Sequence, residues 1–471
     1  MAGTFIIGET KIRPGTYFNI QKAGDNQIAG AIDGITAIFF KGDFGPLNEA
    51  VEITPADGYE NLYGTAGTTA AIREVLSAGV TKCICVRVGK GGTPATVTLN
   101  AGEGDTPALN ITAKYPGAKD FAITVREKLS DSSMKECIIY SGAKEFEKIE
   151  FAAGDDEVKA LNQAFVNSRC FTSEIQDSAT GTVKNVSQVA FTAGTDPTTS
   201  AEEYSAAFAV AEAYRFNTIC VDTEDTAIHQ LLASFLDRIF DVGQLVLGVV
   251  AEKSTVSLDD RMAHAAAFNS EKMHYVVNAA VEISGEAIEG YLVAARIAGM
   301  IAATACNKSL THMVIEGYTK LKDVLTPTQI AAAEQKGCLV LSTNTSAQIW
   351  IDSAINTLVS PADNQDDGWK KIRRTKTRYE LITRCNDQAD SMIGKVDNDT
   401  NGRATVVSQL QAVLNAMVNE GKIVSGTVSE NTTYPADGDY SYYDIDVIDK
   451  DSIEHVYLTY RFQFSSRVAT E

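Results

Sequence analysis

The stretch "NTICVDTEDTAIHQLLASFLDRIFDVGQLVLGVV" (217–250) decides the fold, because it predicts a strand, a helix and a second strand in succession. The runs "NTICV" (217–221) and "QLVLGVV" (244–250) are short and apolar, as buried strands are. Between them the apolar residues recur at helical spacing: Ile228, Leu231, Leu232, Phe235, Leu236, Ile239 and Phe240. The stretch therefore predicts one unit of an α/β fold.

The same alternation continues on both sides of this stretch. Towards the N-terminus the pattern predicts strand 35–40 ("ITAIFF"), a helix over 68–78 and strand 80–88. Towards the C-terminus it predicts helix 258–268, strand 274–279, helix 289–305, helix 327–335 and strand 338–342. Strands that alternate with helices of this length indicate a mainly parallel sheet covered on both faces.

Residues 91–194 interrupt the α/β pattern. They are rich in Thr, Gly, Ala and Asp, and one helix, around 156–165, lies among short alternating runs. Those runs are Ala95–Leu99, Phe121–Val125, Cys137–Tyr140 and Lys148–Phe151. The pattern predicts a small β-rich domain inserted into the α/β domain.

The two ends of the chain also differ from the core. Residues 1–24 contain one strand-like run, Thr16–Ile20, and nothing beside it offers a hairpin partner, so we expect an extended arm. After Thr345 the pattern predicts helices 378–393 and 403–421 and then strands 422–427, 442–448 and 454–464.

Together these patterns predict an α/β core with an inserted β-rich domain and a C-terminal α+β domain. The expected parts are an N-terminal arm (1–24), a core (25–90 plus 195–345), the insertion (91–194), the α+β domain (346–450) and a C-terminal strand arm (451–471).

Composition excludes several classes of protein. The chain has 471 residues, 44% of them hydrophobic, which is enough for about three packed domains. Its net charge of -20 would repel nucleic acid and anionic lipid. Its eight cysteines form no C-x-x-C pair, so we expect reduced thiols. The most apolar window, Tyr291–Cys306, is short for a membrane span, and the first nine residues do not suggest a secretory signal.

The sequence offers little catalytic chemistry. It contains no G-x-G-x-x-G after a strand, no phosphate loop, no G-x-S-x-G elbow and no pair of histidines at helical spacing. One partial calcium motif is present: Asp397, Asp399, Asn401 and Gly402 match the start of an EF-hand loop, but Ser408 stands where a bidentate Glu is needed. We expect an acidic turn with Asn401 at or near the N-cap of the next helix, and neither a metal nor a cofactor.

A strongly basic run stands out in this acidic chain. The segment "WKKIRRTKTRY" (369–379) holds six basic residues in nine positions: Lys370, Lys371, Arg373, Arg374, Lys376 and Arg378. Three interpretations are open: a solvated face that balances nearby acids, a docking patch for an acidic partner, and a nucleic-acid site. The acidity of the rest of the chain disfavours the third interpretation.

Several blocks, in their order and spacing, resemble the contractile tail sheath proteins of phages and phage-tail-like bacteriocins, closest to those of Gram-positive hosts. The blocks are "RPGTYFN" (13–19), "GDFGPLNEAVEIT" (42–54), "LYG" (62–64), "FTAGTD" (191–196), "FNTICV" (216–221), "YLVAARIAGMIAATACNKSLTHMVIEGYTKL" (291–321), "INTLV" (355–359), "KIRRTKTR" (371–378), "GKVDNDTNGR" (394–403) and "DSIEHVYLTYRF" (451–462). Residues 91–190 match least.

The resemblance implies a structural protein of the virion, assembled in the host cytoplasm. It implies a subtilisin-like core domain, an inserted domain that points outward and a C-terminal domain that faces the tail tube. Subunits would form six-fold rings stacked around the tube, and contraction would drive the tube through the host envelope during genome ejection. Expected partners are other copies of the chain, the tail tube protein, and the baseplate and tail terminator proteins, without nucleic acid or membrane insertion.

The resemblance also implies which residues make these contacts. The terminal arms would donate strands to neighbouring subunits. This fits the two terminal strands without local partners, because an unpaired strand edge needs another strand to pair with. The expected exchange strands are Thr16, Tyr17, Phe18, Asn19 and Ile20, and Val456, Tyr457, Leu458, Thr459 and Tyr460. The expected tube contacts are Lys370, Lys371, Arg373, Arg374, Lys376 and Arg378.

Two other classes compete with a sheath subunit. An α/β hydrolase would use the same core, but "NTSAQ" (344–348) lacks the Gly that precedes the Thr of a subtilisin serine motif. A surface adhesin would share the β-rich insertion and carry an export signal. Negative-stain microscopy separates the three, because polymers or rings favour a sheath and compact monomers favour an enzyme.

Overall fold

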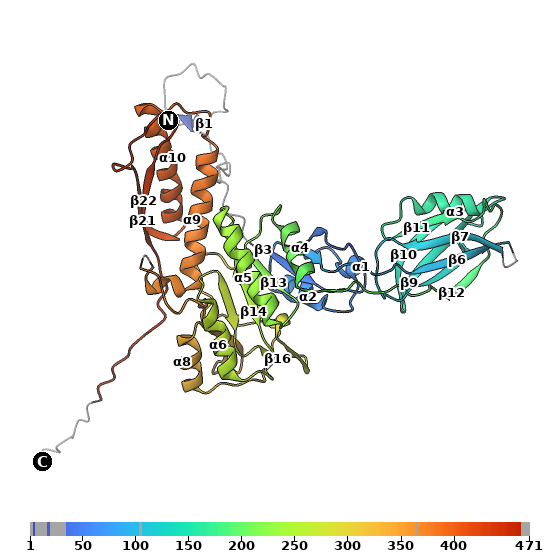
Figure 1. Ribbon diagram of the computed structural model, residues 1–471, viewed down its shortest axis with the longest axis horizontal. Coiled ribbons are helices and arrows are strands. Elements are labelled where there is room, and N and C mark those ends of the chain that lie inside the picture. Colours follow the sequence, from blue (N-terminus) through green and yellow to red (C-terminus); the bar gives the residue numbers. More distant parts are fainter. Residues whose placement is uncertain (1–2, 5–16, 19–33, 103–105, 364, 463–471) are drawn as a thin grey trace, which may run out of the picture. The chain divides into compact units, whose positions relative to one another are not determined.

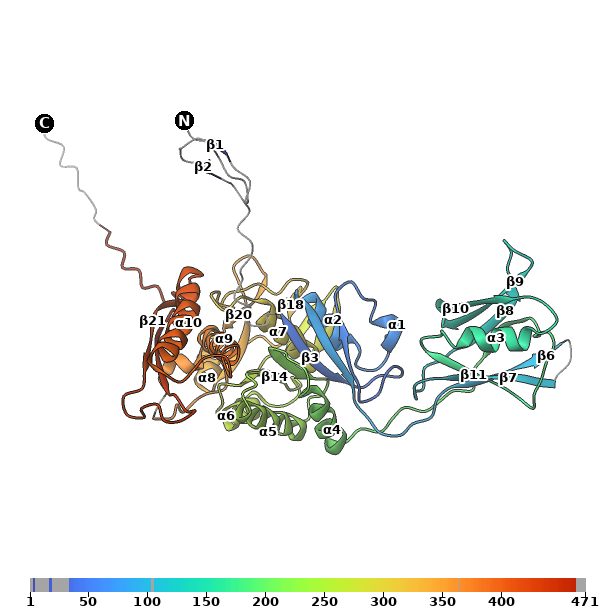
Figure 2. The same cartoon turned by 90° about the horizontal axis from the view of Figure 1, so that it is seen from above.

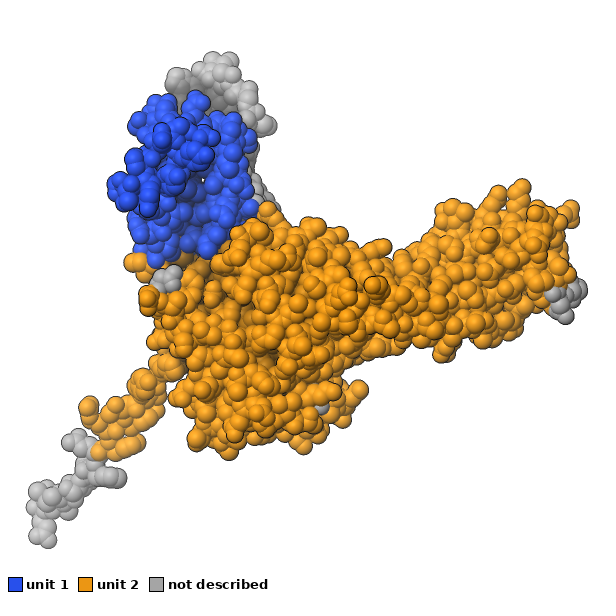
Figure 3. Space-filling view, in the orientation of Figure 1, with its two compact units in different colours: residues 1–31, 380–419, 425–447 blue, residues 32–379, 420–424, 448–471 orange. Residues whose placement is uncertain are grey.

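The structure is a computed structural model that describes residues 3–4, 17–18, 34–102, 106–363 and 365–462. The chain divides into two compact units, coloured separately in Figure 3. Unit 1 comprises residues 1–31, 380–419 and 425–447, and unit 2 comprises residues 32–379, 420–424 and 448–471.

An eight-stranded sheet forms the centre of unit 2 (Figure 1). In spatial order its strands are β20 (Ile349–Ser353), β19 (Cys338–Thr343), β15 (Met273–Val276), β14 (Leu247–Ala251), β13 (Thr218–Val221), β3 (Ile35–Phe40), β5 (Lys82–Arg87) and β4 (Ala50–Ile53). The inner strands run parallel, and β20 and β4 pair antiparallel at the two edges. The predicted, mainly parallel sheet is thus present.

Helices cover both faces of this sheet, because both faces carry apolar side chains (Figure 2). On β3, Ile38 and Phe40 face the cluster that contains α2 (Ala70–Ser77) and α7 (Tyr291–Ala303). The alternate residues of β3 face the cluster that contains α4 (Ala201–Ala211), α5 (Thr226–Asp241), α6 (Leu258–Phe268) and α8 (Pro327–Gln335). This alternation follows from the period of two residues along a strand.

The most apolar helix of the chain is buried within unit 2. In α7 the residues from Val293 to Ala302 are all buried, and Arg296 among them pairs with Glu74 of α2 at 2.8 Å. A buried charge needs such a partner, since an unpaired one is costly. Among the described residues, no helix is both long enough and apolar enough to cross a membrane.

The core sheet continues beyond the boundary expected at residue 345. Ile349 of β20 pairs with Thr343 of β19 through a short turn, so the α/β core includes the segment just after Thr345. Helix α9 (Ile372–Asp390) begins six residues earlier than the predicted helix 378–393, and Ile372 and Tyr379 join the same apolar cluster as α7. The sequence did not predict strand β20, because its short run "IWIDS" has no strong strand pattern.

Further short elements complete unit 2. A three-stranded sheet contains β17 (Glu286–Glu289), β16 (Ala280–Ile283) and β18 (Lys320–Leu321), and α1 (Glu60–Tyr63) follows β4. A single 3₁₀ turn, Asp367–Lys370, precedes α9.

Unit 1 contains the second half of α9, the helix α10 (Thr400–Asn419) and most of two paired strands, β21 (Ile423–Glu430) and β22 (Tyr443–Asp449). Helix α10 buries Leu410, Val413, Leu414 and Met417. The predicted strands 422–427 and 442–448 correspond to β21 and β22.

The inserted region consists of two sheets and one helix around an apolar core of its own. One sheet has the order β11 (Phe171–Ile175), β7 (Thr106–Ala113) and β6 (Thr96–Ala101), and the other has β10 (Lys144–Ala152), β9 (Met134–Ser141), β8 (Ala122–Glu127) and β12 (Val186–Ala190). Helix α3 (Glu157–Phe165) packs beside them. The sequence did not predict β7, β11 or β12, whose residues include many Thr, Ser, Asn and Gln.

Two side chains of the core bind the inserted region to the α/β core. Phe44, in the loop between β3 and β4, belongs to the apolar core of the insertion, with its ring 5.1 Å from that of Phe121. Arg87, at the end of β5, is fully buried and donates to the carbonyl oxygens of Gly42, Gly45 and Pro116 at 2.6–3.0 Å. Pro116 lies in the insertion and the two glycines lie in the core loop, so one guanidinium holds both.

The two chain crossings into the insertion also pair with each other. Isolated bridges join Lys90 to Thr198, Thr93 to Thr195 and Thr96 to Thr192. The crossings therefore lie side by side, and a short linker can join them if the insertion is removed.

We predict that deletion of residues 91–194, with a short Gly/Ser linker, leaves the core folded but poorly soluble because Phe44 becomes exposed. Adding Phe44→Ser to the deletion should restore solubility. In the full chain, Phe44→Ala should cost about 3–5 kcal/mol, as for other buried aromatic residues. Circular dichroism and thermal unfolding of the three proteins measure these effects.

If both deletion proteins are insoluble and the isolated fragment 91–194 is unfolded, residues 91–194 are not a domain that folds on its own, or its ends lie elsewhere.

Candidate assembly interface

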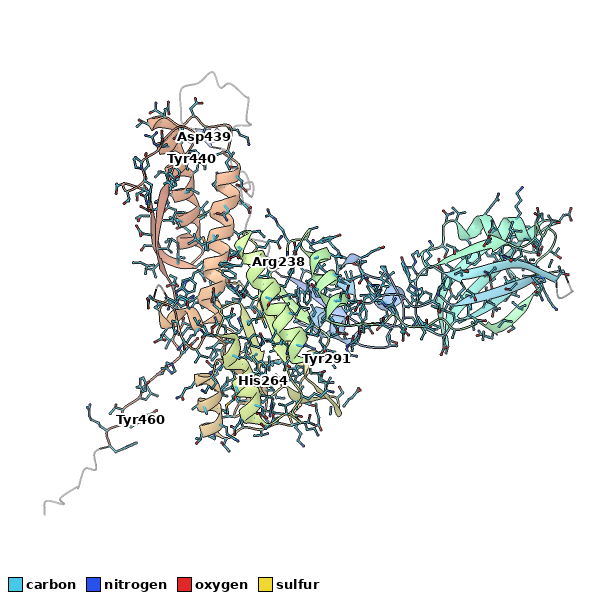
Figure 4. All side chains as sticks on the ribbon, viewed as in Figure 1. Arg238, His264, Tyr291, Asp439, Tyr440 and Tyr460 are labelled. Carbon is cyan, nitrogen blue, oxygen red and sulfur yellow. The ribbon has the colours of Figure 1, made fainter. Side chains whose placement is uncertain are left out.

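The C-terminal arm is the most exposed apolar segment that the structure describes. After β22 ends at Asp449, residues 450–462 form neither helix nor strand. Val456, Leu458, Tyr460 and Phe462 alternate with more polar residues, and Tyr460 is 72% exposed (Figure 4). This is the pattern of an amphipathic strand without a sheet. Of the predicted strand 454–464, the described part, 454–462, pairs with no described strand, and residues 463–464 lie outside the described residues.

The N-terminal arm is described at four residues. Tyr17 and Phe18 form β2 (Tyr17–Phe18), which pairs parallel with β1 (Gly3–Thr4). The run Thr16–Ile20 therefore has a local partner that the sequence did not indicate, although this ladder is only two residues long. Thr16, Asn19 and Ile20 lie outside the described residues.

Strands β21 and β22 offer backbone edges to which another strand can add. They pair with each other in a two-stranded sheet, which on its own is marginal in water. Ile445 and Ile448 of β22 are exposed, so the sheet also presents apolar side chains. An extended peptide that pairs with such an edge gains backbone hydrogen bonds and covers these side chains.

The basic run extends from the end of the 3₁₀ turn, through Lys371, into the first half of α9, and two of its six members are buried. Arg373 and Lys376 are 7% and 9% exposed. The ammonium of Lys376 donates to the carbonyl oxygens of Ile301 and Thr304 at the C-terminal end of α7. A cation at that end satisfies carbonyl groups without helical partners and suits the helix dipole.

Three other members of the run bind carboxylates at the start of the C-terminal arm. Arg374 makes a two-pronged contact with Asp449, at 2.9 Å for each hydrogen bond, and Arg378 reaches the same carboxylate at 3.1 Å. Lys371 lies 2.8 Å from Asp451 and 3.2 Å from Glu454.

The remaining member, Lys370, pairs with the exposed Asp367 at 3.1 Å, and its side chain is 35% exposed. Exposed pairs of this kind contribute little to stability and exchange partners easily. Of the six predicted tube contacts, Lys370 is thus the best placed to meet another protein, and the tube contact of the run stays a prediction.

The carboxylates at the start of the arm have shifted pKa values. Burial alone would raise the pKa of Asp449, but the hydrogen bonds and charge of Arg374, together with the charge of Arg378, outweigh burial and hold it below its usual value. Burial likewise opposes the shift of Asp451, whose pKa is lowered by Lys371 and by the backbone N–H of Ser452. Both carboxylates therefore favour the charged form that pairs with the basic run.

The acidic turn caps a helix, but its capping residue is Asp399. Helix α10 begins at Thr400, and the carboxylate of Asp399 accepts a hydrogen bond from the backbone N–H of Gly402 at 2.7 Å. Asn401, expected at or near the N-cap, lies two residues after it, because the helix starts earlier than predicted. In the part of the chain that the structure describes, no group of three or more His, Cys, Asp or Glu side chains is placed to hold a metal ion.

At the carboxyl edge of the parallel sheet, where α/β enzymes place their active sites, the carboxylate that follows β13 is bound by other parts of the fold. Asp222, which follows β13, accepts hydrogen bonds from the hydroxyls of Thr68 and Tyr204 and from the backbone N–H of Lys41. The run "NTSAQ" (344–348), which departs from a subtilisin serine motif, lies in the turn between β19 and β20, where Asn344 accepts a hydrogen bond from the backbone N–H of Ser346.

Comparisons with known proteins find a tail sheath domain model, a phage-like element protein and solved sheath structures that are similar to this chain. Residues 198–357, which span α4 to α8 and strands β13 to β20, match the model of the phage tail sheath protein central domain. The chain is 22% identical over 375 residues to the phage-like element PBSX protein XkdK of Bacillus subtilis (strain 168), covering 76% of this chain and 75% of that protein.

Two solved structures have the same fold. The sheath tail protein of Desulfitobacterium hafniense is 20% identical and aligns with a TM-score of 0.70 over 93% of this chain and 100% of that chain. The helical sheath of the anti-feeding prophage in its contracted state is 11% identical, with a TM-score of 0.56 over 96% of this chain and 99% of that chain. The predicted resemblance to tail sheath proteins is confirmed, and the mixed α/β fold is the one found in solved sheath structures.

We predict that Asp449→Asn destabilises the protein at neutral pH by about 1–2 kcal/mol, because it removes the charge that Arg374 and Arg378 share. A carboxylate with a lowered pKa stabilises the fold above its usual value of 3.8 and loses this effect as the pH falls through its lower folded value. The difference between wild type and variant should therefore be constant from pH 7 to 5 and shrink below about pH 4. Urea unfolding at several pH values measures it.

A difference that persists unchanged into strong acid would contradict an ionic origin.

Proposed function

We propose that this chain, whose fold is that of tail sheath proteins, is the sheath subunit of a contractile phage tail or a phage-tail-like particle. The observation that carries this proposal is the match of residues 198–357 to the central domain of phage tail sheath proteins, in a chain whose fold aligns along nearly its whole length with a contracted sheath subunit.

The subunits would assemble as stacked six-fold rings around the tail tube, joined by strand exchange. The exposed C-terminal arm supports this mechanism, because residues 450–462 have strand periodicity and join no sheet among the described residues. The edges of β21 and β22 would receive such an arm from a neighbouring copy. Each backbone hydrogen bond gained is worth about 0.5–1.5 kcal/mol net, so a ladder of several can hold while side-chain contacts rearrange.

Contraction would release free energy stored in the extended sheath and drive the tube through the host envelope. In this model the subtilisin-like core of unit 2 forms the wall, the insertion points outward, and the C-terminal region lies nearest the tube. The partners would be other copies of the chain, the tail tube protein, and the baseplate and tail terminator proteins. Assembly would occur in the host cytoplasm and the product would be part of the virion.

A catalytic role has less support. The carboxyl edge of the sheet presents Asp222, whose oxygens are already engaged by Thr68, Tyr204 and Lys41. The matched family model and the solved neighbours are structural sheath proteins, so we infer that this chain is not an enzyme.

The arms provide the first test of this function. Removal of residues 455–471, which leaves Glu454 in place, should give a soluble folded protein that no longer polymerises. Removal of residues 1–20 should have the same effect. Circular dichroism checks the fold and negative-stain microscopy checks the polymers; sheaths like those of wild type from either truncation would contradict strand exchange.

The tube contact provides a second test. Lys370→Glu should impair assembly on the tube while tube-free, contracted-like polymers still form, because a weak exposed charge aligns the rings without holding the subunit together. Reversal of Lys371 and Arg374 would be a less specific test, since both side chains already bind the start of the C-terminal arm. If Lys370→Glu removes both kinds of polymer equally, the residue serves contacts between sheath subunits.

A further inference from the structure

We propose that Lys371, Arg374 and Arg378 form a clamp that holds the root of the C-terminal arm against α9, so that each subunit presents its arm from one fixed point. We call these residues and their partners Asp449, Asp451 and Glu454 the arm clamp. The proposal deepens the proposed function and rests on it where it concerns assembly.

The spacing of the two sides of the clamp matches. Arg374 and Arg378 are four positions apart, so they share one face of α9, and Lys371 lies directly before the first residue of this helix. Asp449 and Asp451 are two positions apart on extended chain, so their side chains point the same way. Arg378 and Arg374 bind Asp449 and Lys371 binds Asp451 and Glu454, so the root runs along α9 towards its N-terminus.

The far end of the root has a second attachment. Glu454 accepts hydrogen bonds from the hydroxyls of Ser309 and Thr311 at 3.4 and 3.3 Å. The Thr311 hydroxyl in turn accepts from the backbone N–H of Ala354, just after β20. The root is therefore tied to the core as well as to α9.

The helix side of the clamp is built to hold its arginines in place. The guanidinium of Arg378 lies 4.2 Å from the centre of the Trp369 ring. Arg374 passes directly over Gly368, where a Cβ would meet the guanidinium at 1.2 Å. A side chain at position 368 would therefore force the guanidinium of Arg374 to move.

The paired carboxylates of the arm end at Glu454. The carboxylates of Asp449, Asp451 and Glu454 are partly buried and paired, with that of Glu454 14% exposed, although the apolar Ile453 between them is 86% exposed. Beyond Glu454, Val456, Tyr457 and Leu458 are 68–92% exposed. A strand that is donated to a neighbour would thus begin where the clamp ends.

The clamp also connects the arm to the core along one path. Ile372, beside Lys371, is fully buried in the apolar cluster that contains α7, and Lys376 binds the C-terminal end of α7. A pull on the arm would pass through the paired charges into α9 and then into the covered sheet. The two-pronged contact of Arg374 fixes direction as well as distance, which a lysine or an apolar contact would not.

The test weakens the clamp without changing the exposed arm. The variant Asp451→Asn with Glu454→Gln removes two charges from the root, and Gly368→Ala displaces Arg374 from the helix side. A charge swap, Arg374→Glu with Asp449→Arg, restores one pair in reverse. Lys370→Glu, which lies next to the clamp and outside it, is the matched control.

Two measurements on the full chain test whether the clamp holds the root and whether assembly depends on it. Hydrogen exchange of the isolated protein should be at least tenfold faster at residues 449–454 in the two weakened variants, and near the wild-type rate in the swap and the control. Negative-stain microscopy should show polymers from wild type, the swap and tube-free Lys370→Glu, and few or disordered polymers from the weakened variants.

Unchanged exchange at 449–454 in the weakened variants would overturn the clamp. Faster exchange with polymers like those of wild type would overturn its role in presenting the arm. If wild type itself forms no polymer, the proposed function fails, and the exchange rates still decide whether the clamp holds the root.

Discussion

A parallel sheet with apolar side chains on both faces has to be covered twice, and this constraint decides where the rest of the chain can go. Helices α2 and α7 cover one face and α4, α5, α6 and α8 cover the other, so the sheet has no free face for a partner. The inserted domain therefore leaves from the end of β5, and the C-terminal region leaves after β20. The surfaces that can bind partner proteins therefore lie in the inserted domain, in the C-terminal region and in the chain ends.

The sequence predicted this core well because its signals are local. Apolar runs such as β3 and β13 are bounded by polar loops, and the apolar stripe of α5 has helical spacing. Elements that depend on distant partners were missed. Strand β20 is a short run that becomes a strand because β19 lies beside it, and the polar strands of the insertion are held by their sheets.

The basic run shows the same limit at the candidate interface. Six cations in nine positions are visible in the sequence, and a face that balances nearby acids was one of the interpretations left open. Asp366, which lies 3.4 Å from Arg374, is near the run in sequence. The shorter contacts of Lys371, Arg374 and Arg378 are with acids more than 70 residues further along the chain, and no local pattern connects them. The exposed Tyr460 and its neighbours were easier to recognise, because period-two alternation is a property of the segment itself.

The joint made by Phe44 and Arg87 limits which domains can replace the insertion during evolution or in engineering. The paired crossings at Lys90 and Thr198 would accept almost any domain whose ends lie close together. A replacement must also bring an apolar cavity for the Phe44 ring and a carbonyl oxygen for the Arg87 guanidinium, as the present domain does with Phe121 and Pro116. A foreign domain that lacks them would leave a buried cation short of an acceptor and an aromatic ring in water, so grafts at this position should succeed only when the loop around Phe44 is exchanged together with the domain.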